Sequence, residues 1–223
     1  MSRTVFITGT DTGVGKSHVA CALLRAARAA GIDAVGYKPV ASGCEQTPDG
    51  WRNADALALQ SAGAFEPYEC INPVALPEAI APHLAARAQG LRIDTQQLGA
   101  GHAALAARHE LVIVEGAGGW RVPLNDEQEL ADWVSAQRWP VLLVVGLRLG
   151  CINHALLSAE SIAARAPLLG WIGNALPPLQ QNWQDNLDSL RQRMPAACLG
   201  TFAPGSMATM PILQAVLDAL RRP

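Results

Sequence analysis

The sequence predicts an α/β fold with a single doubly wound, mostly parallel sheet and helices on both faces. Short apolar runs alternate with helical segments along the 223 residues, as in sheets built from strand–helix–strand units. Several runs are apolar throughout, which is typical of strands covered on both faces. The length, without repeats or a linker, favours one domain over residues 1–223.

The first half of the chain begins with an apolar strand at 4–7, a glycine-rich loop and a helix at 17–30, for which Gly31 is a natural C-terminal cap. A second strand is expected at 33–37, and residues 38–43 are predicted as the loop that follows it. A polar loop at 45–50 precedes a helix that Asn53 can cap. Prolines punctuate the next section, where helices are favoured near 83–89 and 95–109.

Four further strands are predicted in the second half. They are the apolar runs at 111–115, 140–146, 168–173 and 197–201. Helices are expected from near Asn153, at 183–193 and at 211–221. Because strands and helices alternate, the carboxyl ends of the strands should meet at one edge of the sheet, where ligands bind in open parallel sheets.

Composition excludes several classes of protein. Hydrophobic residues make up 50% and charged residues 16%, which is typical of a globular chain and not of a disordered one. The formal net charge of −2 gives no basic surface for nucleic acid or an anionic membrane, and no apolar run reaches membrane-spanning length. The five cysteines lack a zinc spacing and the first strand begins near Met1, so we expect a cytoplasmic protein with reduced thiols.

The loop at residues 9–17 (GTDTGVGKS) matches the phosphate-binding pattern G-x-x-x-x-G-K-[ST] at every required position. Strand, loop and helix follow in the required order, which predicts a P-loop NTPase type of fold. Its glycines allow backbone N–H groups to converge on phosphate oxygens at a helix N-terminus. Lys16 would neutralise the outer phosphates, and Ser17 would hold Mg²⁺. The alternative is a glycine-rich turn that binds nothing.

Lys16, Lys38, Glu115 and Asn174 are predicted at or near strand ends on one edge of the sheet, with Asp55 just beyond them. A magnesium-dependent NTPase needs a carboxylate from another strand to share the metal, and Glu115 stands in that place. Asp55 could complete the acidic environment of the ion. The alternatives are solvated charges at strand ends and, for Asp55, an acid favoured by the helix dipole.

The chain resembles the ATP-dependent dethiobiotin synthetases, which close the ureido ring of the biotin precursor. The likeness runs in order from residue 1 to about residue 178. It is carried by residues 9–17 (GTDTGVGKS), 36–43 (GYKPVASG), 52–57 (RNADAL), 114–120 (VEGAGGW) and 149–154 (LGCINH).

The resemblance implies that the substrates are 7,8-diaminopelargonic acid, CO₂ (or bicarbonate) and MgATP. One amine captures CO₂ as a carbamate, the γ-phosphoryl group passes to the carbamate oxygen, and the neighbouring amine closes the ring with loss of phosphate. The intermediate is a mixed carbamic–phosphoric anhydride. Both transfer steps build negative charge on oxygen, so fixed cations are the catalytic groups expected.

The resemblance also implies a role for each matching residue. Lys38 and Lys16 are catalytic, Ser17, Asp55 and Glu115 hold the metal, and Ser42 binds the amine or carbamate end. The segment Gly150, Cys151, Ile152 and Asn153 binds the substrate carboxylate from a partner subunit, which implies a homodimer, although Asn153 is equally well explained as an N-cap. The ATP-binding residues are Thr12, Gly13, Val14, Gly15, Lys16, Ser17, Asp55, Glu115, Gly116, Ala117, Gly118, Asn174 and Pro204.

Some positions depart from the family pattern. Ala175 follows the adenine-reading Asn174 where a more polar residue often stands, and residues 199–204 only loosely resemble the second base-binding loop. Both departures bear on base selectivity. Trp120 beside the glycine run is predicted near the substrate.

Two other readings compete. A partitioning or site-selection ATPase would carry a second lysine early in the loop, where this chain has Asp11. Another ATP-dependent ligase that forms an acyl phosphate would need an ammonia source, and no glutaminase-like segment is evident.

Overall fold

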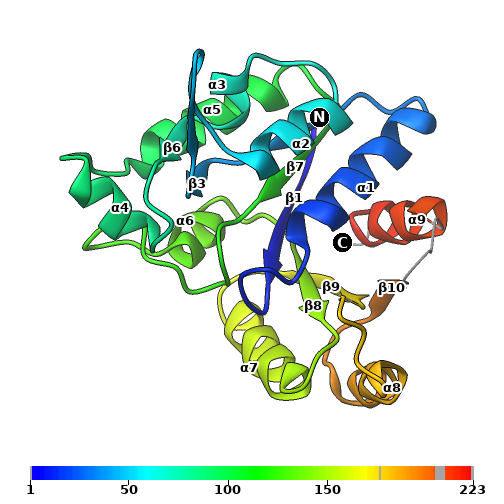
Figure 1. Cartoon of the computed structure of the whole chain (residues 1–223). Helices are drawn as coiled ribbons and strands as arrows, with labels where there is room; N and C mark the ends of the chain where they lie inside the picture. The colour runs from blue at the N-terminus through cyan, green and yellow to red at the C-terminus, as the bar shows by residue number, and fades with distance from the viewer. Residues whose placement is uncertain (1, 176, 204–208, 222–223) are drawn as a thin grey trace.

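A computed structural model describes residues 2–175, 177–203 and 209–221 (Figure 1). Within these ranges, six strands form one fully parallel sheet in the order β10-β9-β8-β1-β7-β2. The predicted doubly wound parallel sheet is therefore confirmed. Its strands are β1 (Arg3–Gly9), β2 (Ala34–Tyr37), β7 (Leu111–Glu115), β8 (Val141–Gly146), β9 (Leu168–Asn174) and β10 (Cys198–Phe202).

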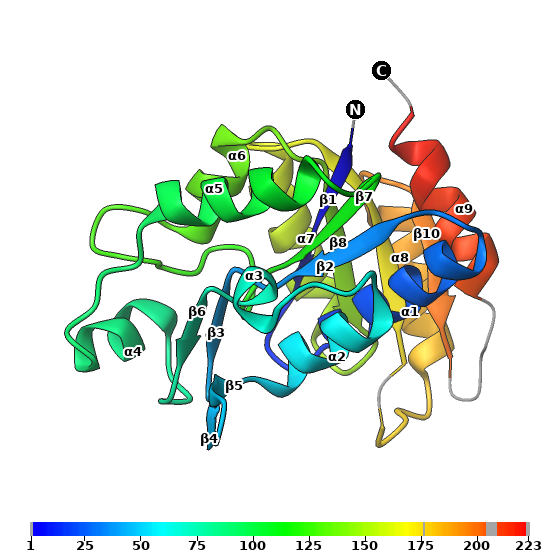
Figure 2. The ribbon, with the colours of Figure 1, turned by 90° about the horizontal axis from the view of Figure 1, so that it is seen from above.

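Helices cover both faces because the chain winds outward from β1 in two directions (Figure 2). Right-handed crossovers that run in opposite directions place their helices on opposite faces. One face carries α1 (Lys16–Ala29), α2 (Ala54–Ala62) and α9 (Thr209–Ala219), which pack together. The other carries α5 (Thr95–Ala106), α6 (Leu130–Ala136) and α7 (Cys151–Ala163), and α8 (Trp183–Arg193) packs against α7.

The centre of the sheet is the core of the protein. Every residue of β7 and β8 is buried, as expected for strands with helices on both sides. Close packing at the edge also positions the site, because a Cβ atom at Gly36 on β2 would lie 2.8 Å from the Cβ atom of Leu59 on α2. Only glycine allows this approach, which packs α2 directly against β2.

The region between β2 and α5 differs most from the prediction. Residues 38–43 were expected to be a loop, but they contain β3 (Val40–Ser42), which pairs in parallel with β6 (Val74–Leu76). The polar segment at 45–50 forms a hairpin of β4 (Glu45–Thr47) and β5 (Gly50–Arg52). The short helix α3 (Tyr68–Ile71) was missed and α4 (Pro82–Ala88) was anticipated. The short strand β3 depends on β6, which is distant in the sequence, so local sequence carries little signal for it.

Helix starts were predicted with mixed success. The side chain of Asn53 accepts hydrogen bonds from the backbone N–H groups of Asp55 (3.1 Å) and Ala56 (3.3 Å), which confirms it as the cap of α2. At α7 the cap is Gly150, in a left-handed conformation with φ 91°. The reading of Asn153 as an N-cap is therefore wrong, because it lies inside the first turn. Among the described helices, none is long and apolar enough to cross a membrane.

Candidate active site

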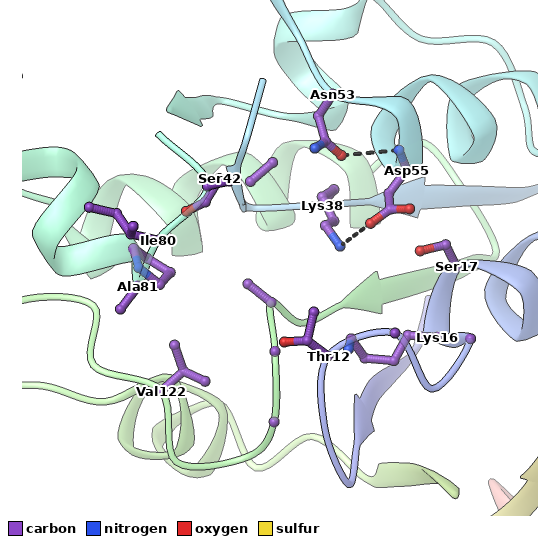
Figure 3. A pocket seen from close by; sticks show the side chains of 18 of the residues that line it. Thr12, Lys16, Ser17, Lys38, Ser42, Asn53, Asp55, Ile80, Ala81 and Val122 are labelled. Carbon is purple, nitrogen blue, oxygen red and sulfur yellow. Dashed lines mark hydrogen bonds and ion pairs between the residues drawn. The ribbon is translucent and has the colours of Figure 1, made fainter. Parts of the chain in front are cut away.

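A cavity of about 820 Å³ lies at the carboxyl edge of the sheet (Figure 3). The loop between β1 and α1 forms one wall, and the segment after β2 and the start of α2 form another. The loops that follow β6 and β7 complete it. This is the edge at which parallel α/β sheets bind ligands. The cavity is lined by 21 of the described residues, including Thr12, Gly13, Gly15, Lys16, Ser17, Lys38, Ser42, Asp55, Ala117 and Gly118.

The loop after β1 has the backbone that its glycines allow. Gly13 has φ 72° and Gly15 has φ 89°, a left-handed region that disfavours other residues. Gly15 caps α1, and Lys16 lies in the first turn, with its ammonium group 3.2 Å from the backbone carbonyl of Asp11. The first N–H groups of α1 have no partner within the helix, so they are available to an anion.

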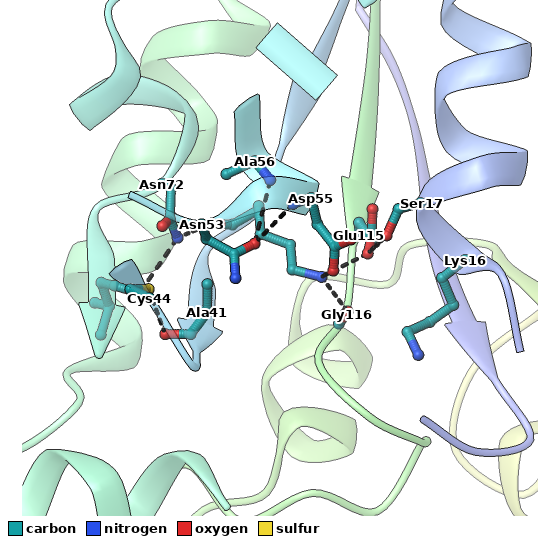
Figure 4. A network of polar contacts seen from close by, with 12 residues as sticks. Lys16, Ser17, Ala41, Cys44, Asn53, Asp55, Ala56, Asn72, Glu115 and Gly116 are labelled. Atoms are coloured by element: carbon teal, nitrogen blue, oxygen red, sulfur yellow. Dashed lines mark hydrogen bonds and ion pairs between the residues drawn. The ribbon is translucent and has the colours of Figure 1, made fainter. Parts of the chain in front are cut away.

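Lys38 is buried and is the centre of a charge network. Figure 4 labels the other members of this network, which are Ser17, Asp55, Glu115 and Gly116. Its ammonium group donates to Glu115 Oε1 at 2.5 Å, to Asp55 Oδ2 at 3.2 Å and to the carbonyl of Gly116 at 3.3 Å. Ser17 Oγ donates to the same oxygen of Glu115 at 2.8 Å. The network therefore connects the phosphate loop with the ends of β2 and β7, as the sequence predicted.

A second set of contacts holds the backbone of Lys38. The N–H group of Lys38 donates to the carbonyl of Ile71 at 2.8 Å, and its carbonyl accepts from Asn72 Nδ2 at 2.7 Å. Tyr68 in turn donates to Asn72 Oδ1 at 2.9 Å. Helix α3 and the residue after it therefore position the lysine. No local pattern predicts this support, because the helix has only four residues.

Burial and neighbouring charges shift the pKa values of Lys38, Asp55 and Lys16. Burial alone would lower the pKa of Lys38, but the carboxylates of Glu115 and Asp55 raise it above its usual value. Burial would raise the pKa of Asp55, which Lys38 instead holds below its usual range. Burial and the nearby Lys38 cation lower the pKa of Lys16 to about 8. Lys38 is thus a permanent cation, whereas Lys16 titrates in an accessible range.

The titration of Lys16 predicts that nucleotide affinity depends on pH. A bound phosphate favours the charged ammonium, so binding above pH 8 must be coupled to proton uptake. We expect the Kd for MgADP to be flat below about pH 7.5 and to rise by up to about tenfold per pH unit above pH 8. Calorimetry across this range measures the effect, and Lys16→Met should bind weakly with a flat profile.

The pKa itself can be measured directly because Lys16 and Lys38 are the only two lysines in the sequence. Lysine-selective ¹³C labelling should give two side-chain signals, which the Lys16→Met variant assigns. One signal should titrate near pH 8, whereas the other should stay charged well above that pH because the pKa of Lys38 is raised by its carboxylate partners. A Kd that stays constant up to about pH 9.5 would contradict the linkage.

Two buried oxygen atoms in the described part of the site have no hydrogen-bond partner. They are Glu115 Oε2 and Ser42 Oγ. Buried polar atoms are normally paired, so both atoms point to a ligand. Carboxylate and hydroxyl oxygens are the ligands that Mg²⁺ prefers, so Ser17, Asp55 and Glu115 fit this ion. Within the described residues, no group of three or more His, Cys, Asp or Glu side chains could hold a metal alone, so phosphate and water would supply its other ligands.

Other predicted residues lie outside this cavity or outside the described chain. Asn174 is buried, and its amide donates to the carbonyl of Val14 at 2.9 Å, which ties β9 to the phosphate loop. Residues 150–153 begin α7 and do not line the cavity. Pro204 falls outside the described residues. Trp120 does not line the cavity, because its ring is buried against Phe6, and its place near the substrate stays a prediction.

An apolar wall, which the sequence did not predict, lies at the end of the cavity away from Lys16 (Figure 3). The wall comes from the loops after β6 and β7, and Ser42 lies beside it. Pro77, Pro82 and Pro123 were the only signal in the sequence, since prolines mark irregular backbone. The wall consists of Ala79, Ile80, Ala81, Pro82, Val122 and Pro123.

The fold and the loop define a class, the P-loop nucleotide-binding proteins. Solved structures with this fold include the septum site-determining protein MinD complexed with Mg-ADP from Pyrococcus horikoshii OT3, with a TM-score of 0.57 and 13% identity over 98% of this chain and 96% of that chain. A ParA family ATPase from Chlorobium tepidum TLS has a TM-score of 0.58 and 12% identity, and the match covers 97% of this chain and 99% of that chain. At these identities the likeness concerns the fold alone.

Sequence comparison narrows the class. A family model described as an AAA domain matches residues 3–206. The ATP-dependent dethiobiotin synthetase BioD of Xanthomonas oryzae pv. oryzae (strain PXO99A) is 51% identical, covering 87% of this chain and 88% of the relative. The protein of the same name from Pseudomonas aeruginosa (strain UCBPP-PA14) is 49% identical, covering 96% of this chain and 95% of the relative. The chain belongs to the ATP-dependent dethiobiotin synthetase family.

Proposed function

We propose that this protein is an ATP-dependent ligase that forms dethiobiotin from 7,8-diaminopelargonic acid and CO₂. The single observation that carries the proposal is the placement of two lysines in one cavity. Lys16 lies on the phosphate loop, and Lys38 is buried between Glu115 and Asp55. The identity of about half of the residues with dethiobiotin synthetases over most of both chains supports the same reaction.

The proposed chemistry uses fixed cations where negative charge develops. A carbamate oxygen of the substrate attacks the γ-phosphorus of ATP, and the bond to the β-phosphate oxygen breaks, which releases ADP. The second amine then attacks the carbamoyl carbon, loses a proton and expels phosphate. Lys16 neutralises the outer phosphates, and Lys38 bridges the carbamate and the γ-phosphoryl group. Mg²⁺ held by Ser17, Asp55 and Glu115 would neutralise phosphate charge.

The proposed substrate site extends from Ser42 along the apolar wall. The unpartnered hydroxyl of Ser42 is free to bind the amine or carbamate end, and Ile80 and Val122 offer apolar surface to the aliphatic chain. The carboxylate would bind at residues 150–153 of a partner subunit in a homodimer. Leu149, 87% exposed beside that segment, supports an interface there. Asn174 and Pro204 remain the proposed adenine-binding residues.

The location of the protein and its domain organisation stay predictions. The cysteines of the chain are free thiols, which supports a reducing compartment such as the cytoplasm. One catalytic unit over residues 1–223 agrees with the family model, which matches residues 3–206.

The partitioning ATPase shares the fold and is the main alternative. In the loop of this chain, the side chain of Asp11 pairs with Arg148 at 2.6 Å, at the position where such ATPases carry a second lysine. A carboxylate there cannot contact the nucleotide of a partner as a cation would. This difference favours the ligase.

Phosphate release from MgATP tests the proposal. Purified protein should release phosphate only when both 7,8-diaminopelargonic acid and bicarbonate are present, and dethiobiotin should form in equal amount, as followed by mass spectrometry. Omission of either compound is the matched control. Hydrolysis that proceeds equally without them would overturn the proposal and favour a nucleotide-switched ATPase.

A further inference from the structure

The two sides of the phosphate loop are chemically different. β1, which leads into the loop, lies between β7 and β8 in the sheet. Lys38, Asp55 and Glu115 all lie on the side of β7 and β2, so the reacting phosphate belongs there. A triphosphate held by the loop would then direct its nucleoside toward the opposite side, where β9 and β10 end.

His18 occupies this opposite side. It follows Ser17 in the first turn of α1, where side chains lean toward the N-terminus of the helix, and it lines the cavity. Its ring lies edge-on to Phe202 on β10, with 5.1 Å between the ring centroids and 79° between the planes. Phe202 is buried and His18 is exposed, so His18 is the ring of this pair that a ligand can touch.

The surroundings of the pair connect it to the loop. Phe202 is in register with Asn174 on β9, and the amide of Asn174 holds the carbonyl of Val14 in the loop. One set of contacts therefore joins the ends of β9 and β10, the phosphate loop and the first turn of α1. An aromatic ring at such a place gives a planar surface for a sugar or base.

We propose that His18 is a specificity-determining residue that contacts the nucleoside part of the nucleotide, with Phe202 fixing the orientation of its ring. This role rests on the proposed function insofar as ATP is the ligand of the cavity. The phosphate groups are bound by the loop and by Lys16, so His18 distinguishes a nucleotide from a bare polyphosphate.

The test compares the Kd values of MgADP and of inorganic tripolyphosphate by calorimetry. His18→Ala should raise the Kd of MgADP about tenfold, the range found when an aromatic partner of a base is removed. The same change should alter the Kd of tripolyphosphate by less than about twofold. His18→Phe should retain most of the affinity for MgADP. Arg25→Ala, an exposed change on the same helix two turns further along, is the control and should alter neither Kd.

Two outcomes would overturn the inference. If His18→Ala lowers the affinity for both ligands equally, the residue contacts phosphate or the loop is damaged. If the affinity for MgADP is unchanged, His18 makes no important contact with the nucleoside. Dethiobiotin formation by the unmodified protein is measured in parallel. If it fails while MgADP still binds, the proposed reaction is wrong, and the role of His18 is still decided by the two Kd values.

Discussion

Replacing Lys38 with methionine should lower the rate of dethiobiotin formation by about a hundred- to a thousandfold, the loss typical when one preorganised charge donor is removed from a developing oxyanion. Methionine keeps an unbranched side chain as far as the position of Cε and removes the ammonium group. In the proposed mechanism Lys38 faces the reacting groups and the loop binds the phosphates of ADP, so we expect the Kd for MgADP to change by less than about threefold. Single-turnover measurements of phosphate and dethiobiotin report the chemical step.

The controls must separate lost chemistry from lost structure. Removal of Lys38 leaves the buried Glu115 without its cation, so the fold needs an independent check by thermal unfolding. The double variant Lys38→Met/Glu115→Gln removes the unpaired charge and should be equally inactive but better folded. Activity of Lys38→Met within about tenfold of the unmodified protein would contradict a catalytic role.

Replacing Glu115 with leucine should reduce the free energy of unfolding by about 3–5 kcal/mol, the usual loss when one partner of a buried ion pair is removed. Glu115 is fully buried and receives hydrogen bonds from both Lys38 and Ser17. Without it, the ammonium group of Lys38 keeps only the half-exposed Asp55 as a counter-ion. Equilibrium unfolding in urea measures the loss.

A double-mutant cycle tests whether the effect comes from the pair. Lys38→Met/Glu115→Leu replaces both charges with apolar groups and should recover most of the stability lost in Glu115→Leu. Glu127→Leu, which breaks an exposed pair with Arg92, should have little effect and serves as the control. If the double variant is as unstable as the sum of the two single variants, Lys38 and Glu115 do not stabilise one another.

The sequence by itself determined the sheet, the phosphate loop and the identity of the charged residues. These features are encoded locally: apolar runs of strand length, glycines at left-handed positions and a cap such as Asn53 act within a few residues. The ends of parallel strands then had to meet at one edge. Lys38 and Glu115, which are 77 residues apart, could therefore be predicted as neighbours.

Only the tertiary structure decided how the site is assembled around these residues. The short pairing of β3 with β6, the support of Lys38 by Asn72 and the apolar wall at Ile80 depend on contacts between distant segments, and no local pattern encodes such contacts. The position of His18 against Phe202 is of the same kind. The tertiary structure also decides the different pKa values of the two lysines. The carboxylates of Glu115 and Asp55 keep Lys38 charged, whereas burial and the Lys38 cation lower the pKa of Lys16 to about 8.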